Sequence, residues 1–372
     1  MQQRKFKIII SGGGTGGHVF PAIAIANAII KKNPDIEILF VGANSRMEME
    51  KVPEAGYKIV GLNVSGFQRK LTLKNIKVLF RLMSSLQKAK KIIKQFKPDA
   101  VVGVGGYASG PVLRIASRRN IPTIIQEQNS YPGITNKILS KKVDRICVAY
   151  DGMEKFFPKE KIYLTGNPVR QDITKLQGKR ERGLELFDLD TAKKTVLVVG
   201  GSLGARTINE SILNNLESFK ENNIQLIWQT GKPFFETASK ACEPYKDFGI
   251  RPNAFISKMD YAYAAADVII SRAGAIAISE ICLVQKPVIL VPSPNVSEDH
   301  QTKNALALSN YQAAILVKDA EAHESLIKTA IDLLNNEDLC NKLIDNISRF
   351  AHKDAADIIA DIILSMINQE SK

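Results

Sequence analysis

The sequence contains no hydrophobic run long enough to cross a membrane. Its longest apolar stretches, such as residues 195–199 and 286–292, fall far short of the roughly 20 residues that a spanning helix needs. Residues 1–10 pass directly into a strand-like pattern, without the apolar core and small-residue cleavage site of a secretory signal peptide. We therefore expect a cytoplasmic protein.

Cysteine and histidine are scarce, with four of each in 372 residues. The cysteines lie far apart and lack metal-ligand spacing, and Cys147 and Cys282 have apolar neighbours. No HxH or HExxH motif and no cysteine cluster occurs. The sequence therefore predicts reduced core thiols, no metal site and no cofactor.

Acidic residues are missing between Glu54 and Asp99, where eleven lysines and arginines occur. Residues 1–165 carry 28 basic and 11 acidic side chains, whereas the remainder carries 23 and 27, which gives a net charge of +13. A basic first half predicts an anionic partner. No recognised nucleic-acid-binding motif accompanies the charge, so we expect a phosphorylated substrate or an acidic lipid surface instead.

Within this basic stretch, residues 67–82 place apolar side chains among the basic ones at helical spacing. Such a pattern is typical of a helix that lies on an anionic membrane surface. The alternative is the solvated face of an ordinary helix packed on the core.

Short apolar runs alternate with amphipathic segments along the whole chain, which predicts parallel sheets covered by helices on both faces. The expected strands are 6–10, 36–41, 100–104, 123–126, 145–149 and 162–165, then 195–199, 224–229, 268–271, 287–291 and 314–317. Both halves open with a strand, a glycine-rich turn and a helix. We expect two doubly wound α/β domains, 1–165 and 166–351, joined near Gly166, with a last helix at about 352–372 that could return to the first domain.

The first glycine-rich turn, 11–18, contains a GxGxxG spacing and ends on His18. Glycines there let the backbone approach a phosphate at a helix N-terminus. A nicotinamide dinucleotide site would need a carboxylate at the end of the second strand, and residues 40–44, where that strand ends, contain none. With an ordinary imidazole pKa of about 6.5, His18 is a candidate general base; the alternative is a structural histidine.

Three further segments follow predicted strands. A second glycine turn, 103–110, would share the sheet edge with the first, and the two could hold a diphosphate together. In the second half, 200–206 is another glycine turn, and 271–280 is a strand end that leads into a helix with Glu280 one turn inside. Glu280 could accept hydrogen bonds from ribose hydroxyls, or it could simply complement the helix dipole. Residues 298–304 are polar enough to bind sugar hydroxyls.

Seven motifs occur in an order that resembles the glycosyltransferase family 28 enzymes that add N-acetylglucosamine to lipid I in peptidoglycan synthesis. They are GGGTGGHVFPAIAIA, GVGGYASGP, EQNSYPG, GNPVR, GGSLGAR, SRAGAIAISE and DHQTKNA, and they span nearly the whole chain. The resemblance implies the GT-B fold, with two Rossmann-like domains facing across a cleft, and an inverting, metal-independent transfer that forms lipid II.

The resemblance also implies roles for individual residues. The donor UDP-N-acetylglucosamine would contact Thr15, Gly16, Gly17, Asn129, Arg170, Ser202, Ile256, Ala275, Ile276, Ala277, Ile278, Ser279, Glu280 and Gln301. The acceptor diphosphate would contact Gly13, Gly14, Gly105, Gly106 and Tyr107. The membrane patch would comprise Lys70, Leu73, Lys74, Ile76, Lys77, Phe80 and Arg81. The protein would then lie peripherally on the cytoplasmic face of the cell (inner) membrane. Other cell-wall enzymes are candidate partners.

Two other functions remain as alternatives. A UDP-N-acetylglucosamine 2-epimerase on the same scaffold would release a soluble product without any lipid. A non-catalytic membrane adaptor would keep the basic apolar segment but would not need the glycine turns or Glu280, whose presence argues against it.

Overall fold

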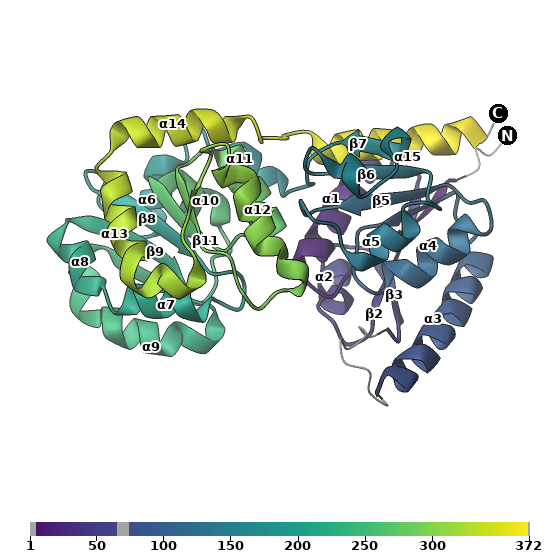
Figure 1. The fold of residues 1–372 in the computed structure, drawn as a ribbon, viewed down its shortest axis with the longest axis horizontal. Coiled ribbons are helices and arrows are strands. Elements are labelled where there is room, and N and C mark those ends of the chain that lie inside the picture. Colours follow the sequence, from purple (N-terminus) through teal and green to yellow (C-terminus); the bar gives the residue numbers. More distant parts are fainter. Residues whose placement is uncertain (1–4, 65–73, 371–372) are drawn as a thin grey trace. The chain divides into compact units, whose positions relative to one another are not determined.

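The computed structural model describes residues 5–64 and 74–370, and gives only the backbone at 74–80, 171, 297 and 370. The chain divides into two compact units: unit 1 is Met1–Val169 with Asp354–Lys372, and unit 2 is Arg170–Lys353. Each unit is an all-parallel sheet between layers of helices (Figure 1). The prediction of two doubly wound parallel-sheet domains is confirmed.

Unit 1 has a seven-stranded sheet in the order β3-β2-β1-β4-β5-β6-β7. Its strands are β1 (Lys7–Ser11), β2 (Glu37–Ala43), β3 (Lys58–Leu62), β4 (Ala100–Gly103), β5 (Thr123–Glu127), β6 (Arg145–Val148) and β7 (Ile162–Leu164). Its helices are α1 (Gly16–Lys32), α2 (Glu48–Glu54), α3 (Lys74–Phe96), α4 (Ser109–Ser117), α5 (Ile134–Leu139) and α15 (Ala355–Glu370).

The central strand β1 shows why its sequence is apolar throughout. Ile8 and Ile10 pack into a core with α1 and α15, whereas Ile9 points to the opposite face and packs with residues of α3 and α4. All three are fully buried. A strand that is covered on both faces has no solvent-facing side, so its sequence does not alternate between apolar and polar residues.

Unit 2 repeats the arrangement with six strands in the order β10-β9-β8-β11-β12-β13. The strands are β8 (Lys194–Val199), β9 (Ile224–Gln229), β10 (Ile250–Asn253), β11 (Val268–Ser271), β12 (Val288–Leu290) and β13 (Ile315–Leu316). The helices are α6 (Arg180–Leu186), α7 (Arg206–Leu213), α8 (Leu216–Glu221), α9 (Lys232–Cys242), α10 (Met259–Ala265), α11 (Ala275–Val284), α12 (His300–Ser309), α13 (Ala322–Leu334) and α14 (Glu337–Ser348).

In each sheet the strand order reverses beside the first strand, between β1 and β4 in unit 1 and between β8 and β11 in unit 2. Ligands of doubly wound sheets bind at the carboxyl ends of the strands at such a reversal. The four turns that follow β1, β4, β8 and β11 are the glycine-rich segments singled out in the sequence. The topology therefore places two of them side by side in each unit.

Two strands, β3 and β10, were not predicted. Both are sheet edges, which need less apolar surface than central strands. The β3 sequence begins with Lys58 and contains Gly61, and β10 contains Arg251 and Pro252. Proline is tolerated at an edge because one side of the strand forms no ladder hydrogen bonds.

Helix α15 belongs to unit 1, although it follows unit 2 in the sequence. Its apolar residues, including Ile359 and Ile363, share a core with Ile25 and Ile29 of α1. An ion pair of 2.8 Å joins Lys32 of α1 to Asp361 of α15. The two helices lie side by side on one face of the sheet (Figure 1). The chain therefore enters and leaves unit 2 from unit 1.

The described part of the chain holds no helix that is both long and apolar enough to span a membrane. All four cysteines are reduced, as predicted, and Cys147, Cys242 and Cys282 are buried. Burial raises the pKa of each of these three thiols to about 12. They are therefore core side chains rather than nucleophiles.

Candidate functional site

The first glycine turn connects β1 to α1 and is built on backbone conformations that favour glycine. Gly13 and Gly14 have φ values of +145° and +93°. The Gly14 N–H donates to the Glu48 carboxylate at 2.9 Å, and the Gly12 N–H donates to the Val41 carbonyl at 3.2 Å. The turn is therefore fixed by the neighbouring strand and by helix α2.

The two glycine turns of unit 1 touch each other. A Cβ atom on Gly106 would lie 2.3 Å from the Gly13 carbonyl oxygen, and one on Gly12 would lie 3.0 Å from the Gly105 carbonyl oxygen. Side chains at these positions would force the turns apart, so glycine is needed for their contact. The structure thus brings together Gly13, Gly14, Gly105 and Gly106, the residues predicted to bind the acceptor diphosphate. The neighbouring Tyr107 is 57% exposed.

His18 lies in the first turn of α1, between these two glycine turns. Its Nδ1 is 3.3 Å from the Thr15 hydroxyl oxygen. Its Cδ2 and Nε2 atoms would be only 2.7 and 2.8 Å from a Cβ on Gly105. The imidazole is half-buried, so it is held by its surroundings and still reaches solvent. Thr15, Gly16 and Gly17 form the helix start beside it, and no side-chain cap covers that N-terminus.

Asn129 follows β5 and is oriented by a buried carboxylate. Glu127 accepts the Asn129 N–H at 3.0 Å and its side-chain amide at 3.2 Å. The same carboxylate accepts the Gly133 N–H at 3.1 Å and the Asn136 amide at 2.7 Å. Burial raises the pKa of Glu127 despite these four donors. Glu127 therefore organises the loop that carries Asn129, a role that the sequence did not indicate.

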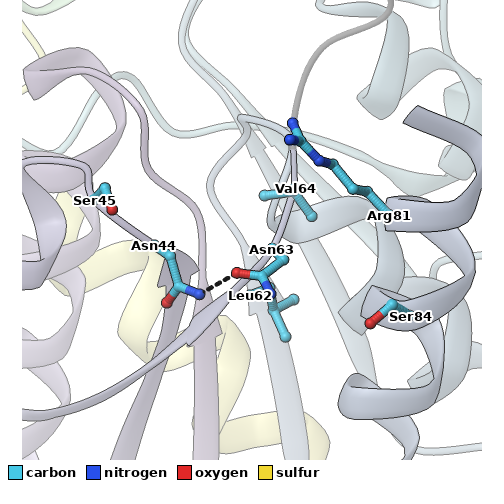
Figure 2. Close-up of a pocket in the computed structure, with 7 residues that line it drawn as sticks. All are labelled: Asn44, Ser45, Leu62, Asn63, Val64, Arg81 and Ser84. Atoms are coloured by element: carbon cyan, nitrogen blue, oxygen red, sulfur yellow. Dashed lines mark hydrogen bonds between the residues drawn. The ribbon is translucent and has the colours of Figure 1, made fainter. Parts of the chain in front are cut away.

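A cavity of about 580 Å³ lies where β2 and β3 end (Figure 2). It is lined by Asn44, Ser45, Leu62, Asn63, Val64, Arg81 and Ser84. Arg81, which was predicted for the membrane patch, points across this cavity from α3. Lys70 and Leu73 lie outside the described residues. Lys74, Ile76, Lys77 and Phe80 belong to α3, but their side chains are outside the described part.

In unit 2 the glycine turn after β8 is held by the buried amide side chain of Gln229. Gly201 and Gly204 have φ values of +90° and +79°. The Gln229 Nε2 donates to the Gly201 carbonyl at 3.1 Å, and its Oε1 accepts the Ile256 N–H at 2.9 Å. Gln229 thus links the turn to Ile256, while Ser202 stands exposed in the turn itself. The Ile256 side chain is buried, so a ligand would meet its backbone.

Helix α11 follows β11 and begins at Ala275 with no side-chain cap. Ala275, Ile276 and Ala277 form the partly exposed first turn. Ile278 is buried and its N–H donates to the Gly274 carbonyl at 2.9 Å, so it belongs to the core. The Ser279 hydroxyl donates to the Ala275 carbonyl at 3.0 Å.

Glu280, one turn further along, is 8% exposed and has two side-chain partners. Arg170 Nε donates to it at 3.2 Å and the Tyr263 hydroxyl donates at 3.1 Å. Burial raises the pKa of Glu280 more than the Arg170 charge lowers it. Burial, together with Glu280, raises the pKa of Tyr263 well above its ordinary value, so the phenol keeps its proton and donates it. The sequence indicated Glu280 and Arg170 but not Tyr263.

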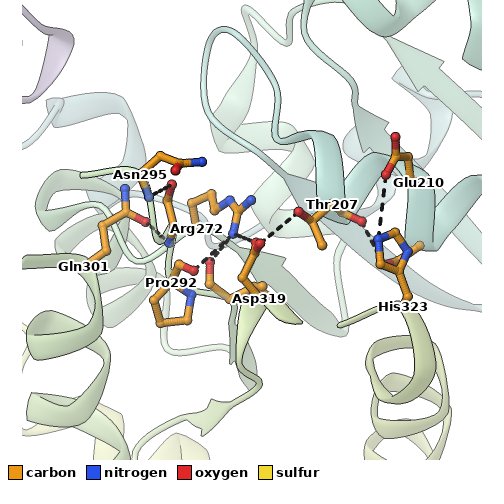
Figure 3. A network of polar contacts seen from close by, with 11 residues as sticks. Thr207, Glu210, Arg272, Pro292, Asn295, Gln301, Asp319 and His323 are labelled. Atoms are coloured by element: carbon orange, nitrogen blue, oxygen red, sulfur yellow. Dashed lines mark hydrogen bonds and ion pairs between the residues drawn. The ribbon is translucent and has the colours of Figure 1, made fainter. Parts of the chain in front are cut away.

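A second polar network lies at the carboxyl ends of β11, β12 and β13 (Figure 3). Asp319 accepts hydrogen bonds from Arg272 and, at 2.9 Å, from the Thr207 hydroxyl. Arg272 also donates to the Val291 and Pro292 carbonyls at 3.1 and 3.2 Å. Gln301 Oε1 accepts the Ser293 N–H at 2.9 Å in the same region. The network fixes the turn that leads into α11, and no sequence signal pointed to Asp319.

Among the described residues, no group of three or more histidine, cysteine, aspartate or glutamate side chains could hold a metal ion. Two aspartates at DxD spacing have structural partners: Asp188 pairs with Arg251 at 2.8 Å, and Asp190 accepts the Ala192 N–H at 2.9 Å.

Two doubly wound domains, each with glycine turns at the reversal of its sheet, define a class of two-domain α/β protein that binds phosphorylated ligands at strand ends. The chain belongs to glycosyltransferase family 28. The N-terminal domain of this family matches residues 8–148, and its C-terminal domain matches residues 195–362. The predicted family resemblance is confirmed.

Curated relatives match over the whole length. Proteins from Parabacteroides distasonis and Phocaeicola vulgatus are each 56% identical, over 99% and 100% of this chain and 100% and 99% of their own. Both are named UDP-N-acetylglucosamine--N-acetylmuramyl-(pentapeptide) pyrophosphoryl-undecaprenol N-acetylglucosamine transferase.

Solved structures with a similar fold include a member of the same enzyme class and an epimerase. MurG of Acinetobacter baumannii is 27% identical, with a TM-score of 0.78 over 97% of this chain and 100% of that chain. A UDP-GlcNAc 2-epimerase from Neisseria meningitidis shares the fold at 16% identity, with a TM-score of 0.67 over 97% of this chain and 100% of its own.

Proposed function

We propose that the protein transfers N-acetylglucosamine from UDP-N-acetylglucosamine to the 4-hydroxyl of the muramyl sugar of undecaprenyl-diphosphate-MurNAc-pentapeptide (lipid I), forming lipid II. The observation that carries this proposal is the match of 56% identity over the full length to relatives named for this transfer. The glycine turns and the buried Glu280 support it, because they supply the groups that two diphosphate-containing substrates require.

Unit 2 is assigned to the donor. Glu280 accepts the ribose hydroxyls, and Tyr263 and Arg170 hold its carboxylate in place. The backbone at Ile256 faces the uracil, and Gln301 faces the sugar. Ser202 and the first turn of α11 offer hydroxyl and N–H groups to the diphosphate, where a helix N-terminus carries about half a positive charge.

Unit 1 is assigned to the acceptor. Gly13, Gly14, Gly105, Gly106 and Tyr107 surround the position of the lipid diphosphate, and His18 is the general base. The acceptor oxygen forms a bond to the anomeric carbon of the donor from the face opposite UDP, while the bond from that carbon to UDP breaks. The hydroxyl proton passes to His18, and the configuration inverts. Arg170 and the helix N-termini of unit 2 stabilise the charge on the departing diphosphate.

Turnover with UDP-N-acetylglucosamine tests this function, measured with and without a lipid I analogue and in the presence of a chelator. We expect UDP release only when the lipid acceptor is present, at a rate that the chelator leaves unchanged. Release of UDP or epimerisation without lipid would instead establish the 2-epimerase alternative. Binding of the lipid without any turnover would establish the adaptor.

We also propose that helix α3 and the segment before it attach the protein peripherally to the cytoplasmic face of the cell membrane. The basis is the sequence between Glu54 and Asp99, which carries eleven basic and no acidic residues. Each Lys or Arg near an anionic lipid surface contributes about 1 kcal/mol, and salt screens that attraction.

Vesicle sedimentation measures this attachment. We expect capture by anionic vesicles, weakened by high salt, and much less capture by neutral vesicles. Changing Lys74, Lys77 and Arg81 to glutamine should weaken capture about 100-fold, since roughly 3 kcal/mol is lost. The matched control changes three exposed lysines of unit 2, Lys240, Lys328 and Lys342, and should keep most of the binding. Equal capture by neutral vesicles would disprove the electrostatic attachment.

A further inference from the structure

Glu48 is a buried carboxylate directly beneath the first glycine turn, in the first turn of α2. It is 1% exposed. Its Oε2 accepts the Gly14 N–H at 2.9 Å, and its Oε1 accepts the Ala43 N–H at the end of β2, also at 2.9 Å. The two oxygens thus join the glycine turn to the neighbouring strand. Neither the transfer chemistry nor the family motifs quoted above give this residue a role.

Glu48 packs so closely against Gly13 and Gly42 that neither position could carry a side chain without moving it. A Cβ on Gly13 would lie 2.1 Å from its Oε1, and a Cβ on Gly42 would lie 2.5 Å from its Cγ. The turn therefore lies directly against the carboxylate. Because Gly13 and Gly14 have positive φ values and no side chains, they cannot fix the turn themselves. The hydrogen bonds that Glu48 accepts from Gly14 and Ala43 hold the turn in this conformation instead.

The hydrogen bond from Gly14 to Glu48 is connected to the His18 imidazole through Gly14 and Thr15. Thr15 directly follows the held Gly14, and its hydroxyl oxygen is 3.3 Å from His18 Nδ1. Its carbonyl also accepts the His18 N–H at 3.0 Å and the Val19 N–H at 3.1 Å, which starts α1. A shift of Gly14 would therefore move both the partner of the imidazole and the start of the helix that carries it.

We infer that Glu48 is a positioning residue: through Gly14 and Thr15 it sets the place of the His18 imidazole for proton transfer. Its carboxylate also occupies the Gly14 N–H, so an incoming diphosphate must use the other donors of the turn and the α1 N-terminus. This role in catalysis rests on the proposed function, whereas the coupling between Glu48 and His18 is a property of the protein without substrates.

Glu48→Gln tests the inference, because glutamine keeps the volume but turns one of the two oxygens into an NH₂ group that faces an N–H donor. We expect kcat to fall about 10- to 100-fold, since a small misplacement of a catalytic group costs this much, and the KM for UDP-N-acetylglucosamine to stay within about twofold. In the protein without substrates, the His18 imidazole NMR signals should shift, while those of His300, His323 and His352 stay in place.

Glu50→Gln is the matched control, because Glu50 is exposed on the same helix and pairs only loosely with Lys51 at 3.2 Å. It should leave kcat and all histidine signals unchanged. If Glu48→Gln does not fold, Gly14→Ala perturbs the other end of the same hydrogen bond. The space around Gly14 is open, but its φ of +93° strains alanine, so the same His18 shift is expected.

The outcomes separate the two proposals. His18 signals that stay in place in the folded Glu48→Gln protein would overturn the inference, whether or not kcat falls. A wild-type protein without any lipid-dependent turnover would overturn the proposed function, and the NMR result would still decide whether Glu48 positions His18.

Discussion

Replacing His18 by alanine is expected to lower kcat about 100- to 10,000-fold, the range that general base catalysis usually contributes. The side chain is held by Thr15 and lies against Gly105, so it is fixed in place at the two touching glycine turns. No other histidine of the described chain occupies such a turn: His300 begins α12, His323 lies in α13 and pairs with Glu210 at 3.7 Å, and His352 precedes α15.

The measurement is single-turnover transfer at saturating concentrations of both substrates, together with the affinity for UDP. Because His18 belongs to unit 1 and the donor is assigned to unit 2, UDP affinity should change by less than about twofold, so the loss appears in the chemical step. His323→Ala is the matched control and should be fully active. Near-normal turnover of His18→Ala, with unchanged binding, would rule out His18 as the base.

Thr15→Val offers a graded version of the same experiment. It removes the hydroxyl near Nδ1 but keeps the imidazole, so we expect an intermediate loss in kcat. An unchanged kcat in Thr15→Val would show that the Thr15 hydroxyl does not position the imidazole.

Glu280→Gln is expected to raise the KM for UDP-N-acetylglucosamine about 10- to 100-fold. Hydrogen bonds to a charged group contribute about 1.5–3 kcal/mol, and each 1.4 kcal/mol changes affinity tenfold. The ribose lies away from the reacting carbon, so kcat should change only a few-fold. Glutamine also removes the charge that faces Arg170 at 3.2 Å, which loosens the pair in the protein without substrates.

Steady-state kinetics with varied donor and calorimetric binding of UDP measure this effect. Tyr263→Phe deletes one neutral donor to Glu280 and should cost less, about 2- to 10-fold in KM. Glu324→Gln, at an exposed position of α13, is the control and should behave like wild type. An unchanged donor KM in Glu280→Gln would remove Glu280 from the donor site.

The raised pKa of Glu280 gives the same substitution a second readout. Because burial favours the neutral carboxyl in the folded protein, its contribution to the free energy of unfolding is present below the ordinary glutamate pKa and is lost as the pH rises through the raised value. The Glu280→Gln variant does not lose stability in this way, because the glutamine amide does not titrate. Urea unfolding measured from about pH 4 upward should therefore show wild type losing stability relative to the variant as the pH rises above the ordinary glutamate pKa. Parallel profiles would contradict the raised pKa.

The location of the central strands and of the glycine turns could be predicted because each depends on local sequence. Runs such as Ile8–Ile10 are apolar because both faces of the strand are buried, and a turn such as Gly13-Gly14 needs residues that tolerate positive φ. Strands β3 and β10 escaped prediction because polar residues, glycine or proline interrupt their apolar sequence: β3 begins with Lys58 and contains Gly61, and β10 contains Arg251 and Pro252. Their edge positions tolerate such residues.

The fold class, the glycine turns and the candidates His18 and Glu280 follow from patterns within a few residues of one another, and Arg170 follows from the family resemblance of its motif. The side chains that hold these residues in place could be identified only in the folded chain. Glu48 meets Gly14 across 34 residues, Asp319 meets Arg272 across 47, and Arg170 meets Glu280 across 110. Such pairs form because parallel strands bring their carboxyl ends to one edge, and no local pattern records which distant side chain arrives there.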